Sequence, residues 1–210
     1  MDHFSNAGAI FFSKTLALPK PLKFRDVRLY AFAALFAALD VLVPWIFHQF
    51  HLAGPTFLPM HFFALLAGLT LGWRAGLLVG LSTPLISFGV SGMPISALLP
   101  QITFELIFYG LAAGILREKF NLRIIWALLG AMLTGRLALG IAVLLLYLGK
   151  AMPIPNVLSA IQQGSANIIN PLTYLWLVIQ QGWPGIITQL ILIPPLARVL
   201  SNWWQKKLDA

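Results

Sequence analysis

Long apolar stretches, each broken by very few ionisable residues, constrain this chain more than any other feature. An ionised side chain at the centre of a bilayer costs at least ~2.5–3.5 kcal/mol on insertion scales. The residues of this kind within the apolar stretches are Asp40, His61, Glu105 and Arg136. We expect them to be paired and to face the interior of a helical bundle. The chain is therefore predicted to be an all-α, polytopic membrane protein with a polar site inside it.

The composition supports this class and argues against others. Hydrophobic residues make up 59 % of the chain and charged residues 10 %, whereas a soluble domain has roughly 25 % charged residues. Cysteine is absent, which excludes disulfides, thiolate nucleophiles and Cys-ligated metals. The net charge of +8 fits the excess of basic residues on the cytoplasmic side of membrane proteins, so we expect no nucleic-acid partner. No Walker A sequence occurs, so any use of ATP requires a partner.

Six spans are predicted, because a membrane helix needs about 20 apolar residues, or fewer when it is buried in a bundle. The predicted spans are 29–47, 58–73, 75–90, 95–116, 124–148 and 184–203. Apart from Arg136, which lies within a span, the Lys and Arg residues then fall at one end of the bundle, with Lys150 as the exception. The excess of positive charge predicts that this end, with both termini, is cytoplasmic.

The domain organisation follows from these spans. Residues 1–28 are interpreted as a cytoplasmic arm or interfacial helix, 29–203 as the six-helix transmembrane domain and 204–210 as a cytoplasmic tail. Segment 156–182 has a short apolar stretch between Asn, Pro and Gln residues. We interpret it as an external loop with a short helix lying against the bundle, because a seventh span would place the last lysines outside.

Polar residues are predicted to concentrate from the middle of the membrane outward. Asp40 lies past the middle of the first span, His61 at the outer start of the second, and Glu105 and Arg136 near the middle of the fourth and fifth. The inner halves contain almost nothing that ionises. A channel or proton relay would need polar groups at all depths. This distribution predicts a cavity that is open to the exterior and closed to the cytoplasm.

Two roles are open for the pair formed by Glu105 and Arg136. They are a buried ion pair that fixes helix register, or a site in which Arg136 binds a ligand carboxylate or carbonyl while Glu105 holds the guanidinium. The roles are compatible. Asp40 either contributes to the ligand site or caps an outer helix end. The candidate substrate-binding residues are Arg136, Glu105, Gln101, His61, Asn170, Gln189 and Asp40.

Two segments with glycine and proline, SFGVSGMP (87–94) and GKAMPIPN (149–156), are expected at the external face, and the first is expected not to be regular helix. They are either loops that close over a ligand or ordinary connectors. The first contains the GxSG of rhomboid proteases, but no histidine follows Ser91 to act as its base, so we expect no enzyme. His48, His51 and His61 have no completing ligand set, so we expect no metal and no cofactor.

An alanine-rich stretch opens the first span. Ala33 and Ala37, and likewise Ala34 and Ala38, are four residues apart, and Ala31 adjoins them. Small residues at this spacing allow another helix to approach closely. The stretch therefore predicts either packing within the bundle or a docking face for a coupling partner.

Four stretches, taken in order, carry a resemblance to a known family. They are LPMHFFALLAGLTLGWRAGLLVGLSTPLISFGVSGMP (58–94), FELIFYGLAAGILREK (104–119), GRLALG (135–140) and GWPGIITQLILIPPL (182–196). Over about residues 28–203 the chain resembles the substrate-binding (S) subunits of energy-coupling factor (ECF) transporters. It is most similar to the group that includes the pantothenate-specific subunits.

The resemblance implies a six-helix subunit of a bacterial or archaeal plasma membrane that captures a vitamin or related micronutrient from outside. It also implies docking on a transmembrane coupling subunit with two ABC ATPases, through an AxxxA face on the first helix. The family's sites lie in the outer half, a location that fits Gln101, Glu105, Arg136, Asn170 and Gln189. An anionic ligand such as pantothenate would explain Arg136. Other vitamins would favour stacking on outer aromatic residues, for which the candidates are Trp45, Trp176, Trp183 and Tyr174.

Two other functions stay open from the sequence. One is a stand-alone secondary transporter coupled to protons through Glu105 and Asp40. The other is a structural or chaperone-like membrane protein in which Glu105 and Arg136 join helices and no ligand binds.

Overall fold

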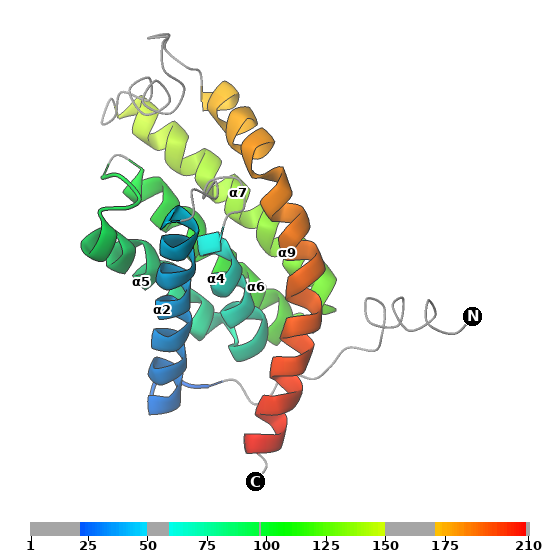
Figure 1. The fold of residues 1–210 in the computed structure, drawn as a ribbon. Coiled ribbons are helices and arrows are strands. Elements are labelled where there is room, and N and C mark those ends of the chain that lie inside the picture. Colours follow the sequence, from blue (N-terminus) through cyan, green and yellow to red (C-terminus); the bar gives the residue numbers. More distant parts are fainter. Residues whose placement is uncertain (1–21, 50–58, 97, 150–170, 209–210) are drawn as a thin grey trace.

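The structure, a computed structural model, describes residues 22–49, 59–96, 98–149 and 171–208. These residues form helices and no strand (Figure 1). The helices are α2 (Val27–Gln49), α4 (Pro59–Leu71), α5 (Trp73–Ser91), α6 (Leu99–Glu118), α7 (Ile124–Leu148) and α9 (Pro171–Leu208). Five of them are long and apolar enough to cross a membrane, and α4 is a shorter apolar helix. The prediction of an all-α, multi-pass membrane protein is confirmed.

The last helix differs from its predicted bounds. We expected residues 171–182 within an external loop that carries a short helix, separate from the last span. They are instead the first turns of α9, so the expectation of a separate loop is wrong for them. Tyr174 and Leu175 of these turns pack with Leu139 and Val143 of α7, and this packing stabilises a helix that continues into the last span. The rest of the expected loop, 156–170, lies outside the described residues, as do most of the N-terminal arm and residues 209–210. Helix α9 also continues through 204–208, the start of the expected tail.

Helix α4 is the centre of the bundle. It contacts each of the other described helices, and every residue from Ala64 to Leu71 is buried. Its 13 residues span about 20 Å, which is less than the ~30 Å thickness of the hydrocarbon core. Helix α5 begins two residues after the C-terminus of α4, which fixes that end of α4 at the turn between them. Because α4 is too short to cross the bundle, its N-terminal end lies inside. Figure 1 shows this first turn, in cyan, part-way along α2 and α9.

Glycines allow α4, α5 and α6 to pack closely. A Cβ on Gly76 of α5 would collide with the backbone carbonyl of Gly110 on α6, and a Cβ on Gly110 would collide with that of Gly76. A Cβ on Gly68 of α4 would also meet the Gly110 carbonyl. Backbones approach this closely in membrane bundles where small residues face each other. The three helices therefore converge at Gly110.

Helix α5 continues into the glycine-containing segment 87–94, where the sequence predicted irregular backbone. Residues 87–91 are helical, so the expectation that 87–94 is not regular helix is wrong for them. The helix stops at Gly92, whose φ of 71° is left-handed and whose N–H bonds to the Phe88 carbonyl. Glycine is the residue that adopts this C-terminal cap without strain.

One end of the bundle collects the charged residues that flank the helices. Arg74, at the start of α5, forms an ion pair with Glu118, at the end of α6, at 3.1 Å. The Arg74 guanidinium also lies over the Trp73 ring, 4.6 Å from its centroid. The first residue of α2 and the last residue of α9 lie at this same end (Figure 1). We call it the basic end; its assignment to the cytoplasm stays a prediction.

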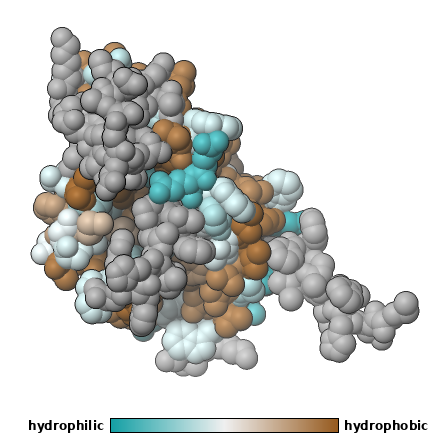
Figure 2. All heavy atoms as spheres, turned by 45° about the horizontal axis from the view of Figure 1, so that its top comes forward, coloured by the Kyte–Doolittle hydropathy of each residue, from teal (hydrophilic) through white to brown (hydrophobic). Residues whose placement is uncertain are grey.

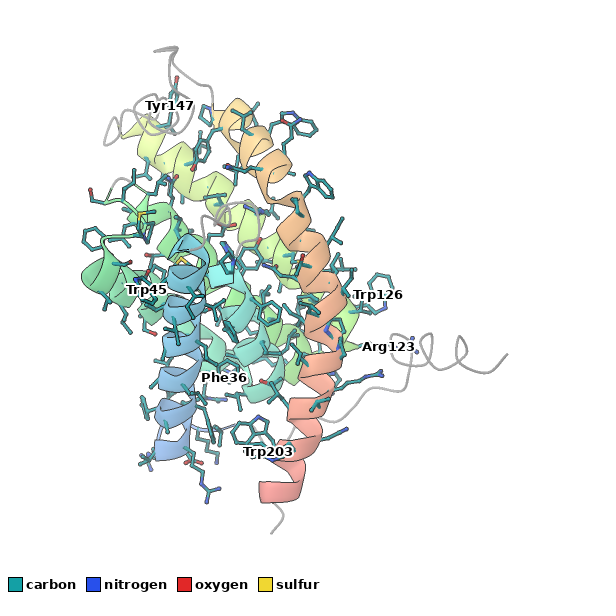
Figure 3. The ribbon with its side chains drawn as sticks, in the orientation of Figure 1. Phe36, Trp45, Arg123, Trp126, Tyr147 and Trp203 are labelled. Carbon is teal, nitrogen blue, oxygen red and sulfur yellow. The ribbon has the colours of Figure 1, made fainter. Side chains whose placement is uncertain are left out.

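The outer surface is that of a lipid-facing protein. Large apolar side chains along α7, such as Leu133, Leu137 and Ile141, are exposed. Figure 2 shows hydrophobic residues on both sides of a hydrophilic patch. In Figure 3, Trp203 lies toward the basic end and Tyr147 toward the opposite end, while Trp45 and Trp126 lie at an intermediate level. Aromatic residues such as Trp203 and Tyr147 are enriched at the two membrane interfaces.

Candidate functional site

Three helices bring together three of the four ionisable residues that lie within the apolar stretches. Nη1 of Arg136, on α7, lies 3.0 Å from Oε1 of Glu105, on α6. Nε2 of His61, on α4, lies 3.4 Å from Oε2 of the same glutamate. Glu105 is 3 % exposed and His61 6 %, while the Arg136 side chain is 12 % exposed. We call Glu105, Arg136 and His61 the polar cluster.

The position of the polar cluster follows from where its helices begin. His61 is in the first turn of α4, and this turn lies inside the bundle because α4 is short. The N-terminus of a helix carries a partial positive charge, which favours the nearby carboxylate of Glu105. Glu105 is 13 residues from the end of α6 at Glu118, or about 20 Å from the basic end. The polar cluster is therefore separated from the basic end by several helical turns.

The polar cluster has unused hydrogen-bonding capacity. The Nε, Nη1 and Nη2 atoms of Arg136 are buried and have no hydrogen-bond partner in the described part of the chain. The same holds for both ring nitrogens of His61 and for Oε1 of Glu105. The contact of Arg136 with Glu105 is thus a close ion pair whose N–H groups do not point at the carboxylate. A buried polar group without a partner costs about 1–3 kcal/mol, so these atoms are suited to a ligand.

Two buried tyrosines adjoin the polar cluster. The Tyr109 ring meets the His61 ring edge-on, with 5.0 Å between centroids. A Cβ on Gly135 of α7 would collide with the Tyr109 ring, so the glycine before Arg136 makes room for this tyrosine. Tyr174, from the first turns of α9, is within electrostatic range of Glu105 and Arg136. Tyr174 was among the aromatic candidates for ligand stacking, whereas the sequence did not single out Tyr109.

A family model described as the ECF transporter substrate-specific component matches residues 28–197. The chain belongs to this family. The family consists of substrate-binding membrane subunits of a transporter rather than of enzymes, and such S components associate with a membrane coupling subunit and ATPases. No curated protein and no solved structure matches this S component.

The remaining polar candidates of the S component differ in placement. Gln101 is buried one turn before Glu105 on α6 and interacts with the side chain of Tyr174, so it adjoins the polar cluster. Gln189 is buried on α9, and its place in the site stays a prediction. Asn170 lies outside the described residues.

Asp40 is bound away from the polar cluster. It is completely buried. Its Oδ1 accepts a hydrogen bond from the backbone N–H of Phe63 at 3.1 Å, and its Oδ2 accepts one from the Thr83 hydroxyl at 3.4 Å. Asp40 therefore connects α2 to α4 and α5. Of the two roles that the sequence left open for it, this position fits the capping of a helix end better than a direct ligand contact.

The alanines of the predicted docking face are on two sides of α2. Ala33 and Ala37 are buried inside the bundle, so they serve helix packing within the S component. Ala31, Ala34 and Ala38 are exposed. A partner helix would therefore contact Ala34 and Ala38, the second AxxxA pair, together with Ala31. Ala33 and Ala37 are no longer part of the proposed docking face.

The aromatic residues also divide by exposure. Trp45, Trp176 and Trp183 are exposed at the surface, as expected for interfacial anchors. Tyr174 is buried beside the polar cluster. Of the aromatic candidates for ligand stacking, Tyr174 is thus the one whose position fits.

The residues considered for a metal site and for a protease motif are described in part. Within the described residues, no group of three or more His, Asp or Glu side chains is placed to hold a metal; His51 lies outside them. The Ser91 hydroxyl donates to the Ser87 carbonyl of its own helix at 2.8 Å.

Proposed function

We propose that this S component binds a small vitamin-like carboxylate from the exterior at the polar cluster, with pantothenate as the specific candidate. It then docks on a transmembrane coupling subunit with two ABC ATPases in a bacterial or archaeal plasma membrane. The observation that carries the proposal is the buried guanidinium of Arg136, held at Glu105 with its N–H groups unused.

The donors and acceptors of the polar cluster favour a ligand of this class. The planar guanidinium of Arg136 matches the two oxygens of a carboxylate. The charges of Arg136 and Glu105 compensate each other, and the His61 ring adjoins the same carboxylate. Oε1 of Glu105 has no hydrogen-bond donor in the described residues and would accept from a ligand hydroxyl. Gln101, Gln189 and Asn170 are the further candidate contacts.

The packing toward the basic end supports capture from one side. Leu65 and Leu69 of α4 pack with Ala113 of α6 and with Leu128 and Ala131 of α7 in one buried apolar core. This core lies between the polar cluster and the basic end. If the basic end is cytoplasmic, the ligand site is open to the exterior and closed to the cytoplasm. Release of the ligand into the cytoplasm would therefore require a partner.

A double-substitution cycle tests the role of Arg136. Arg136→Gln should lower pantothenate affinity by about 10- to 100-fold, because a hydrogen bond to a charged group contributes about 1.5–3 kcal/mol. It should also destabilise the protein by about 3–5 kcal/mol, because Glu105 is left buried without its counter-charge. Combining it with Glu105→Gln removes that charge, so stability should largely return while binding does not. Calorimetric titration and thermal unfolding of the purified protein measure the two effects.

Arg74→Gln is the matched control, because this arginine pairs with a glutamate at the basic end. It should leave pantothenate binding unchanged. Wild-type affinity in the Arg136→Gln, Glu105→Gln double variant would contradict the proposed site. Native mass spectrometry of protein purified from its own cells identifies the ligand directly, and a bound molecule without an anionic group would contradict the proposed class.

A further inference from the structure

Asp40 is a completely buried carboxylate that the proposed ligand site does not use. It accepts hydrogen bonds from the backbone of Phe63 and from the Thr83 hydroxyl, and the backbone N–H of Ala64 interacts with it as well. No basic side chain in the described residues forms an ion pair with it. A carboxylate inside a membrane protein is costly, so these contacts with the start of α4 need an explanation.

The backbone that Asp40 holds carries a residue of the polar cluster. Phe63 is two residues after His61 on α4, so both belong to the same helical turn. A carboxylate at this end of a helix interacts favourably with the partial positive charge there. From His61 the contacts continue to Glu105 and then to Arg136. Polar contacts thus join α2 to α4 and α4 to α6 and α7, and within α4 the backbone connects the two sets.

The other side of α2 at this level is the exposed alanine face. Ala38 is exposed and precedes Asp40 by two residues, which places them about 200° apart around the helix axis. One helix therefore presents a surface to a partner on one side and holds the first turn of α4 on the other.

The geometry points to Asp40 as a positioning residue: its carboxylate fixes the first turn of α4, holds His61 against Glu105, and so connects the docking helix to the ligand site. The last part rests on the proposed function, because it takes the polar cluster as that site. A displacement of α2 on docking would move the turn that carries His61 and weaken the site. Asp40 would act through His61, without touching the ligand.

Histidine-selective 15N NMR of the full chain in lipid nanodiscs tests the positioning role without any ligand. The ring signals of His61 are assigned with His61→Gln. In Asp40→Ala they should shift, and backbone hydrogen exchange at Phe63 and Ala64 should become at least tenfold faster. Thr83→Val is the matched control, because it removes one contact of the carboxylate and leaves its bonds to α4; it should leave both measurements near wild type. If Asp40→Ala does not fold, Asp40→Asn replaces it, with smaller shifts in the same direction.

The possible results separate this inference from the proposed function. Unchanged His61 signals in a folded Asp40 variant would overturn the inference, even if its thermal stability falls. Shifted His61 signals with a pantothenate affinity lowered about tenfold would support both proposals. Shifted signals in a protein whose wild type does not bind pantothenate would support the positioning role and reject the proposed ligand.

Discussion

Glu105 is tolerated at this depth because two basic side chains from different helices reach it. Arg136 and His61 each lie against one of its oxygens, whereas an isolated buried carboxylate would cost several kcal/mol. The His61 ring packs in turn against Tyr109, whose ring occupies the space left by Gly135. Gly135, which has no side chain, thus leaves the space in which an aromatic ring packs against the polar cluster.

Gly135→Ala should disturb the site through Tyr109. The new methyl group would collide with the tyrosine ring, and overpacking of this kind costs about 1–3 kcal/mol. We expect lower stability in thermal unfolding and weaker ligand binding in titration calorimetry. Gly89→Ala is the control, because nothing lies within 4 Å of its added methyl group and alanine favours helix by about 0.5–1 kcal/mol. Equal behaviour of the two variants would disprove the role of the Tyr109 position.

At the scale of the elements, the short helix α4 decides the architecture. Because it is buried on all sides and touches every other described helix, its length determines where the polar cluster lies. Its contact with α5 and α6 depends on backbone approach at Gly68, Gly76 and Gly110. Without these glycines the helices would separate, and His61 would move away from Glu105.

Gly110→Ala should therefore destabilise the bundle by about 1–3 kcal/mol or more, because the added methyl group meets the backbone carbonyl of Gly76, which cannot rotate away. Gly140→Ala is the comparison: its methyl group would meet the end of the flexible Leu175 side chain at 3.3 Å, so we expect a small effect. Thermal unfolding of the two variants in the same detergent measures the difference. A Gly110→Ala protein as stable as wild type would show that the glycine contact is not required.

At the scale of the whole molecule, α2 has two functional sides. Ala37 faces the core, while Ala34 and Ala38 face outward. Ala38→Leu should leave folding and ligand binding intact but impair uptake in cells, because it blocks close approach by a partner helix. Ala37→Leu should instead destabilise the isolated protein through overpacking. Normal uptake by the Ala38→Leu variant would remove the docking proposal.

The packing of the bundle also argues against a carrier that works alone. Between the polar cluster and the basic end, Leu65, Leu69 and Leu128 form a fully buried apolar core. We expect proteoliposomes that contain only this chain to bind labelled pantothenate without accumulating it under a pH gradient. Accumulation would favour the proton-coupled transporter. Added coupling subunit, ATPases and ATP provide the positive control.

Within the described chain, all the predicted spans are helical, and the first five agree with the helices to within four residues. This agreement is expected, because apolar length and charge distribution are properties of the chain itself. The short helix expected before the last span is instead continuous with it as the start of α9, because these residues pack on α7 despite their polar flanks. The pairing of Glu105 with Arg136 was anticipated, whereas Tyr109 was not, since nothing in an aromatic residue alone shows which side it faces.

The sequence by itself determined that the chain crosses a membrane, that its basic residues gather at one end and that its few ionisable residues within the spans need partners. The reason is that an unpaired charge in the hydrocarbon core is costly in free energy. Only the tertiary structure decided which partners they find. It placed Asp40 on the start of α4 instead of in the polar cluster, and it divided the alanines of α2 between core and surface. The physical reason is that helix rotation and the depth at which α4 begins depend on contacts between helices, which no single stretch of sequence contains.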